Sequence, residues 1–96
     1  LDFDIGSLVY SLMLRLRGLL MIKLISNNKD YSKKELFDFL RKYKFSDNQI
    51  EEFYRIYSSE RNGNKIKSNE TINKKEVSRL YDITYSLLDD ISSKLK

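Results

Sequence analysis

Arg61 and the polar stretch that follows it hold the side chains best suited to chemistry in this chain. Arg61 and Asn62 end a segment with helical spacing, and Lys65 and Lys67 come a few positions later. A guanidinium can hold a phosphate through two parallel hydrogen bonds, and lysines add positive charge beside it. These four residues are therefore the candidate site for the phosphate of a nucleotide or an RNA. We expect the Arg61 side chain to be partly buried beside this polar stretch.

A structural role for Arg61 is the alternative. A cation in the last turn of a helix interacts favourably with the helix dipole, by about 0.3–1 kcal/mol, and the stem of an arginine packs well on apolar surface. Arg61 lies four positions after Tyr57 and seven after Tyr54, so it continues the apolar stripe of its helix. Spacing alone favours this alternative over phosphate binding.

Four of the seven tyrosines lie at helical spacing in two segments. Tyr54, Tyr57, Tyr81 and Tyr85 are placed to join the core or to form a surface on which nucleic-acid bases stack. An aromatic stripe at this spacing is more often part of a core. The core is therefore the simpler interpretation, and the stacking surface is the alternative.

The chain contains neither His nor Cys. Their absence excludes a cysteine nucleophile, a thiolate zinc site and the commonest general base near neutral pH. Asp82, Asp89 and Asp90 resemble a carboxylate cluster, but a solvated helix face explains them better than a metal site. We therefore predict no catalytic residue, no metal and no cofactor, and we do not assign the chain to an enzyme class.

The length and composition are those of one globular domain spanning residues 1–96. Hydrophobic residues make up 41% of the sequence and charged residues 33%, which is a globular rather than a disordered balance. Against 14 Asp and Glu, 18 Lys and Arg give a net charge of +4. This excess suits nucleic acid or an acidic partner, and it equally suits an AT-rich genome. We expect a cytoplasmic protein, and Leu1 in place of Met is compatible with a fragment or a processed product.

Residues 5–25 are apolar over a length that raises the question of a membrane span. Arg15 and Arg17 lie in the middle of this segment, and each charge at a bilayer centre costs about 2.5–3.5 kcal/mol. Two aspartates precede the segment, where a signal peptide carries cations. We therefore predict a helix over about residues 4–26 that is not in a membrane. Its apolar residues cover too much of the circumference for one partner, which predicts packing on two sides and a homodimer.

One helix-start pattern occurs three times after residue 30. Ser32, Ser46 and Asn73 are each followed three positions later by Glu or Gln, with an apolar residue before and after this pattern. The first side chain caps backbone N–H groups, the Glu or Gln caps in return, and the apolar pair packs across the helix start. The pattern predicts helices that begin at residues 33, 47 and 74.

Apolar residues keep helical periodicity after each start, and no segment alternates over a useful length with the period of a strand. We predict an all-α fold, an up-and-down helical bundle of four or five helices, with long helices first and last and two shorter ones between. Gly63 is placed to end the third helix. Residues 62–72 then form the longest connection, which is rich in Asn and Lys.

This order of parts resembles the HEPN family (higher eukaryotes and prokaryotes nucleotide-binding domains). The resemblance depends on residues 56–63 (IYSSERNG), which contain the Arg61-Asn62 dipeptide, and on the long final helix over residues 74–94. In layout it covers residues 5–95, and its specific motif is two residues long. The family implies a bundle of four or five helices, commonly a homodimer in which the motif arginines of both copies face one shared cleft.

Many members of the family are metal-independent ribonucleases, toxins paired with a small nucleotidyltransferase in toxin–antitoxin systems, or RNA-cleaving parts of defence systems. Their motif continues to a His, which would fall at Ile66, Lys67 or Ser68, and none of these is His. The resemblance therefore implies a non-catalytic domain that dimerises and binds a nucleotide, RNA or a partner protein through the Arg61 region. A ribonuclease that uses Arg61 without His and a purely structural interaction module are the alternatives.

Overall fold

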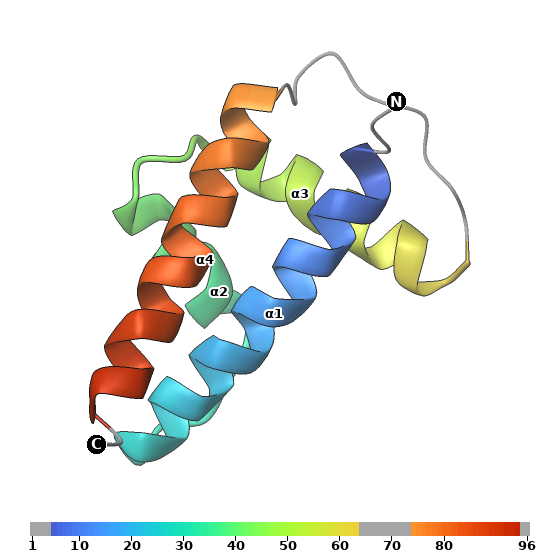
Figure 1. Ribbon diagram of the computed structural model, residues 1–96. Helices are drawn as coiled ribbons and strands as arrows, with labels where there is room; N and C mark the ends of the chain where they lie inside the picture. The colour runs from blue at the N-terminus through green and yellow to red at the C-terminus, as the bar shows by residue number, and fades with distance from the viewer. Residues whose placement is uncertain (1–4, 64–73, 95–96) are drawn as a thin grey trace.

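Four helices make up the described part of the computed structural model, which covers residues 5–63 and 74–94 (Figure 1). The helices are α1 (Ile5–Ser26), α2 (Lys33–Lys42), α3 (Asp47–Arg61) and α4 (Lys74–Lys94). α1 and α4 are 22 and 21 residues long, against 10 and 15 residues for α2 and α3. The described residues contain no strand. The predicted all-α bundle, with two long helices at the ends and two shorter ones between, is confirmed.

Side-chain caps set the starts of the two short helices. At α3 the Ser46 Oγ accepts a hydrogen bond from the Gln49 N–H at 3.2 Å, and the Ser46 N–H donates to Gln49 Oε1 at 3.0 Å. At α2 the Ser32 Oγ accepts from the Glu35 N–H at 3.3 Å. These bonds satisfy N–H groups that have no partner within the helix. The predicted starts at residues 33, 47 and 74 are confirmed, while the third cap, Asn73, lies outside the described residues.

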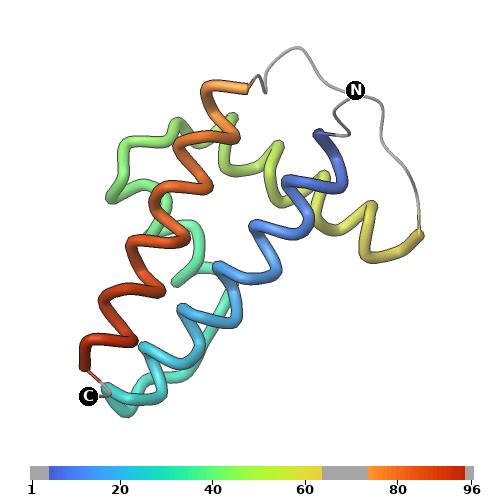
Figure 2. The backbone as a smooth tube through the Cα atoms, viewed as in Figure 1, coloured from blue at the N-terminus to red at the C-terminus, as the bar shows by residue number. Residues whose placement is uncertain are grey.

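α1 is the central helix and contacts both α3 and α4 (Figure 2). Its buried residues cover a broad face, and they are Gly6, Val9, Leu12, Met13, Leu16, Leu20 and Leu24. The predicted packing of α1 on two sides is therefore confirmed within one chain. α4 lies beside α1 and runs in the same direction, while α3 crosses α1 steeply (Figure 2). In the described ranges, no helix combines the length and the apolar character that crossing a bilayer requires.

Apolar side chains of all four helices meet in one core. The largest completely buried side chains are Met13, Leu16, Leu36, Leu40, Ile50, Phe53 and Leu80. Burying a side chain of this size contributes about 1.5–3 kcal/mol. The one buried polar side chain in the described residues, Thr84, donates its hydroxyl to the Leu80 carbonyl at 2.7 Å. The buried Thr84 hydroxyl is therefore hydrogen-bonded, and its burial carries no penalty for an unsatisfied donor.

A residue in the left-handed backbone region follows each of α1, α2 and α3. Gly63 follows α3 with φ +83°, and its N–H donates to the Glu60 carbonyl at 3.0 Å. The predicted helix end at this glycine is confirmed. Lys44 follows α2 with φ 68°, and Asn28 follows α1 with φ 60°. Only glycine adopts this conformation without steric cost, so Lys44 holds a conformation that its side chain disfavours.

Candidate functional site

The described residues of the predicted phosphate site lie at the C-terminal end of α3. Arg61 is the last residue of the helix, and its side chain is exposed. Asn62 follows as the cap, and its backbone N–H donates to carbonyl oxygens of the last turn. Lys65 and Lys67 lie outside the described residues. The expectation of a partly buried Arg61 is wrong, because Tyr57, one turn earlier, is the last residue of α3 that the core covers.

The four tyrosines considered for base stacking lie in two pairs. Tyr54 and Tyr57 on α3 have ring centroids 5.8 Å apart, and Tyr81 and Tyr85 on α4 have ring centroids 4.5 Å apart. The α3 pair continues onto α1, because the Tyr10 ring stacks on the Tyr57 ring at 5.5 Å. Tyr57 is itself only 3% exposed and belongs to the core.

α1 separates these two tyrosine pairs. Arg15 Nη1 of α1 donates to the Tyr85 hydroxyl at 2.9 Å, which joins the α4 pair to α1. Tyr10, which joins the α3 pair to α1, lies five positions before Arg15 and therefore about 140° away around the helix. The four tyrosines do not form one stacking surface.

Tyr54 of the α3 pair belongs to a larger surface, which we call the basic–aromatic face. Its members are Tyr10 and Arg17 of α1, Tyr31 before α2, Lys33 and Phe37 of α2, and Tyr54 of α3, and the buried Tyr57 ring contacts Tyr10 and Tyr54 from the core. Three helices thus contribute cations and rings to one side of the molecule.

Lys33 joins α2 to α3 on this face. Its Nζ lies 4.5 Å from the centroid of the Tyr54 ring and 5.3 Å from that of the Phe37 ring. The two rings meet edge to face, with centroids 5.6 Å apart. A cation above an aromatic ring is attracted by about 0.5–1 kcal/mol at an exposed site. The ammonium group of Lys33 is therefore held over two half-buried rings.

Arg17 makes the corresponding contact with Tyr31. The guanidinium carbon lies 5.4 Å from the centroid of the Tyr31 ring. Burial raises the pKa of Tyr31 above its usual value of 10.0, although the charge of Arg17 and its hydrogen bond to the hydroxyl oppose the rise. The hydroxyls of Tyr54 and Tyr57 add to the rise, so the phenol groups gather around this point. Tyr31 is consequently neutral near pH 7, and its O–H remains a donor.

Three cations on this side of the molecule lack a carboxylate partner among the described residues. They are Arg17, Lys33 and Arg61. Arg61 belongs with the other two because it lies seven positions after Tyr54, on the same side of α3. Arg41, by contrast, is neutralised by Asp38 at 2.9 Å and Asp47 at 2.8 Å. The basic–aromatic face therefore combines uncompensated positive charge with partly exposed rings.

Arg17 and Lys33 were not among the site residues predicted from the sequence. In the sequence, Arg17 appears as a charge that opposes membrane insertion, and Lys33 as the first residue after a cap. For Lys33 the sequence did contain a signal, because Phe37 follows it by four positions and residues four apart share one face of a helix. The contact of Arg17 with Tyr31 has no such signal, because it depends on how the chain turns after α1.

Comparisons with protein-family models, with curated proteins and with solved structures found no match. The HEPN resemblance accordingly rests on the order of the helices and on the Arg61-Asn62 dipeptide. Over residues 5–63 and 74–94, no three acidic side chains come together in a group that could hold a metal ion. The chemistry that this site offers is that of its cations, hydroxyl groups and rings.

Proposed function

We propose that this chain is a HEPN-like domain without catalytic activity, and that it binds single-stranded RNA through the basic–aromatic face and Arg61. The observation that carries the proposal is a set of unpaired cations, with Arg17 and Lys33 beside half-buried rings and Arg61 further along α3. Proteins that hold single-stranded nucleic acid combine a positively charged track with aromatic rings on which bases stack. The net charge of +4 adds attraction at longer range.

The spread of the cations favours a polynucleotide over a single nucleotide. Lys33 lies over Tyr54, and Arg61 follows Tyr54 by seven residues, which is about 10 Å along α3. Arg17 adds a third positive charge from α1, beside Tyr31. One phosphate group cannot contact cations separated by this distance, whereas the backbone of an RNA strand can.

The family resemblance supports the same class of ligand. Arg61 and Asn62 match the first two positions of the family motif, and we propose that Lys65 and Lys67 add charge next to them. The absence of His leaves no ordinary group to exchange a proton with the ribose near neutral pH, so binding without cleavage is the proposed activity. Self-association as a homodimer and pairing with a nucleotidyltransferase, as in toxin–antitoxin systems, are also part of the proposal.

Fluorescence anisotropy of a labelled oligouridine, titrated with the full chain at several salt concentrations, tests RNA binding. We expect the affinity to fall as salt rises, because phosphate contacts release counterions. Lys33→Ala should weaken binding by about tenfold, which is the scale of one charged hydrogen bond. Lys42→Ala is the matched control, because Lys42 is also an exposed lysine of α2 but lies nine positions away, about half a turn around the helix.

Each alternative gives a different result in this experiment. Absent or salt-independent binding by the wild type would contradict the proposal, and so would equal losses for Lys33→Ala and Lys42→Ala. Efficient displacement of the RNA by ATP would identify a nucleotide as the ligand instead. Cleavage of the RNA that disappears in Arg61→Ala would identify a ribonuclease.

A further inference from the structure

The exposed large apolar side chains belong mostly to α1 and α4, and three of them, Ile22, Tyr81 and Leu88, line the seam between these helices. Six large hydrophobic residues among the described ones are exposed, and five of them belong to these two helices. They are Leu14, Ile22 and Ile25 of α1 and Tyr81 and Leu88 of α4. Ile25 is 65% exposed and Tyr81 is 50% exposed. An exposed cluster of this kind marks a surface that binds a partner.

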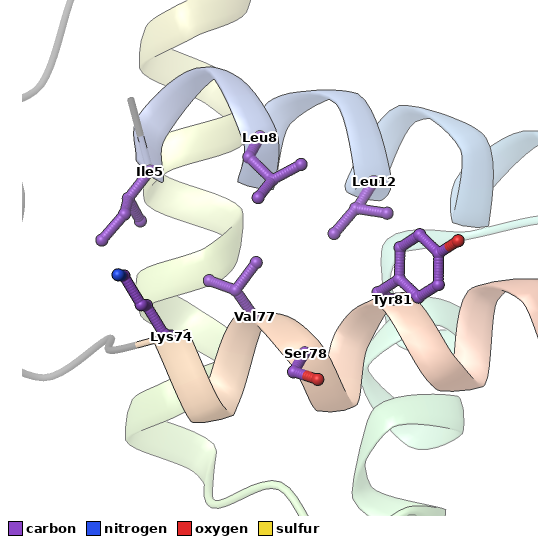
Figure 3. A pocket seen from close by; sticks show the side chains of 7 residues that line it. All are labelled: Ile5, Leu8, Leu12, Lys74, Val77, Ser78 and Tyr81. Atoms are coloured by element: carbon purple, nitrogen blue, oxygen red, sulfur yellow. The ribbon is translucent and has the colours of Figure 1, made fainter. Parts of the chain in front are cut away.

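The seam between α1 and α4 is hollowed as well as apolar. In a first hollow, of about 220 Å³, Leu8 of α1 faces Val77 of α4 (Figure 3). A second hollow, of about 280 Å³, lies further along the same seam between Ile22 and Leu88. Gly18 lines this second hollow, and a Cβ added there would meet no atom within 4 Å. We call this seam, with its two hollows, the α1–α4 groove, and it has room to receive side chains of a partner.

Beside the second hollow, charges of opposite sign lie on α1 and α4 without pairing, whereas further along the seam Lys23 of α1 pairs with Asp90 of α4 at 4.0 Å. On α1, Arg15 is exposed, and its described hydrogen bond goes to the Tyr85 hydroxyl rather than to a carboxylate. On α4, Asp82 and Asp89 are exposed, and no described cation lies within 4.0 Å of either. Both carboxylates lie about one turn from Tyr85, on its outer side. Beside the second hollow the groove therefore offers Arg15 on its α1 side and Asp82 and Asp89 on its α4 side, while Lys74 of α4 lines the first hollow.

A two-fold axis makes this charge pattern complementary to itself. α1 and α4 run in the same direction, and Arg15 lies level with Tyr85 (Figure 2). A rotation by half a turn about an axis along the groove places α1 of one copy over α4 of the other. Arg15 of each copy then lies level with Tyr85 of its partner, between Asp82 and Asp89. An isologous contact of this kind forms every charge pair twice.

We infer that the α1–α4 groove binds a second copy of this chain, and that Arg15 of each copy pairs with Asp82 and Asp89 of the other. The exposed side chains of Ile22, Tyr81 and Leu88, which line the groove, are then buried between the two copies. The inference rests on the self-association in the proposed function and is independent of RNA binding.

This arrangement differs from the shared arginine cleft that the family resemblance implies. The groove lies on the side of α1 that carries Arg15, whereas α3 packs on the side that carries Tyr10. Each α3, with Arg61 at its end, is therefore on the outside of the pair of molecules. The basic–aromatic face of each copy remains open, and the two Arg61 side chains do not face each other.

Sedimentation equilibrium of this chain and of two charge-reversal variants tests the groove. Arg15→Glu places Glu against aspartates, and Asp82→Lys with Asp89→Lys places lysines against Arg15. Each variant alone should dimerise at least about tenfold more weakly than the wild type, because like charges meet twice. An equimolar mixture of the two variants should restore dimerisation, because both contacts of the mixed dimer then join opposite charges. This rescue cannot come from a change within one chain.

The matched controls reverse exposed charges away from the groove. Lys42→Glu and Asp30→Lys should dimerise like the wild type, and circular dichroism should show that all variants are folded. A wild type that stays monomeric would overturn both the self-association and this inference. If the dimer withstood Arg15→Glu, or if the mixture of variants failed to dimerise, the α1–α4 groove would not be the interface, and self-association itself would still hold. A dimer weakened by Arg61→Glu and unaffected by Arg15→Glu would show that the shared cleft is the interface.

Discussion

The guanidinium carbon of Arg79 lies 4.2 Å above the ring of Phe45, at the point where α4 passes the connection between α2 and α3. The same side chain donates from Nη2 to the Tyr43 carbonyl at 2.9 Å and from Nη1 to Glu76 at 3.0 Å. α4 packs chiefly on α1, so Arg79 supplies a link between α4 and the other half of the bundle. Because Phe45 is 4% exposed, this cation covers a core ring.

Arg79→Ala should lower the free energy of unfolding by about 1–2 kcal/mol, because it removes a cation–π contact and a hydrogen bond to a carbonyl. Urea denaturation followed by circular dichroism measures this loss. Arg55→Ala is the control, since Arg55 makes a similar ion pair with Glu52 within one helix but does not join two elements. The control should cost less than about 0.5 kcal/mol, and an equal loss in both variants would contradict the linking role of Arg79.

Lys44→Gly should raise the free energy of unfolding by about 1 kcal/mol. The φ of 68° at Lys44 is unfavourable for a residue with a Cβ, whereas glycine adopts it without steric cost. Lys42→Gly, two residues earlier and within α2, should act in the opposite direction, because glycine weakens a helix. Urea denaturation of both variants checks the signs, and destabilisation by Lys44→Gly would show that its side chain makes a compensating contact.

Ser46→Ala should destabilise the protein by about 1 kcal/mol, because the Gln49 N–H loses its acceptor at the start of α3. Thermal unfolding measures the effect. Ser92→Ala serves as the comparison, since Ser92 is exposed within α4 and substitution by alanine suits a helix. If Ser46→Ala and Ser92→Ala had the same effect on the melting temperature, the capping box would not stabilise α3.

Tyr31 should make the stability depend on pH in the alkaline range. Its pKa is raised in the folded protein, chiefly by burial, so the folded chain keeps a proton that the unfolded chain loses near pH 10.0. This contribution is fully present below that pH and is lost as the pH rises through the folded pKa. Urea denaturation at about pH 8 and about pH 11 should therefore show a smaller alkaline loss for Tyr31→Phe than for the wild type. Equal alkaline losses of stability in the wild type and in Tyr31→Phe would mean that the pKa of Tyr31 does not differ between the folded and the unfolded protein.

Arg61→Ala should leave the stability nearly unchanged, within about 0.5 kcal/mol, because the side chain is exposed at the end of α3. The same variant should weaken RNA binding by roughly 1.5–3 kcal/mol, the scale of a charged hydrogen bond. Thermal unfolding and anisotropy on one preparation separate the two effects. Normal binding together with a large fall in the melting temperature would mean that Arg61 only stabilises the helix end.

Local patterns in the sequence determined where the helices begin and end. Ser32 and Ser46 each cap a helix by accepting from an N–H group three residues later, and Gly63 ends α3 by donating to the Glu60 carbonyl. Interactions of such short range need no knowledge of the rest of the chain, because the partners are neighbours in every conformation that starts a helix. The apolar residues around α1 also sufficed to predict a helix packed on two sides.

Tertiary structure alone decided which charges and rings come together. Arg15 bonds to Tyr85 over 70 positions of sequence, and Arg17 meets the Tyr31 ring across the turn after α1. Arg61 is exposed because the core ends at Tyr57, one turn earlier. The spacing of Arg61 from Tyr54 and Tyr57 in the sequence does not reveal where the core ends. These contacts depend on the directions in which whole helices cross, and packing of the complete core sets those directions.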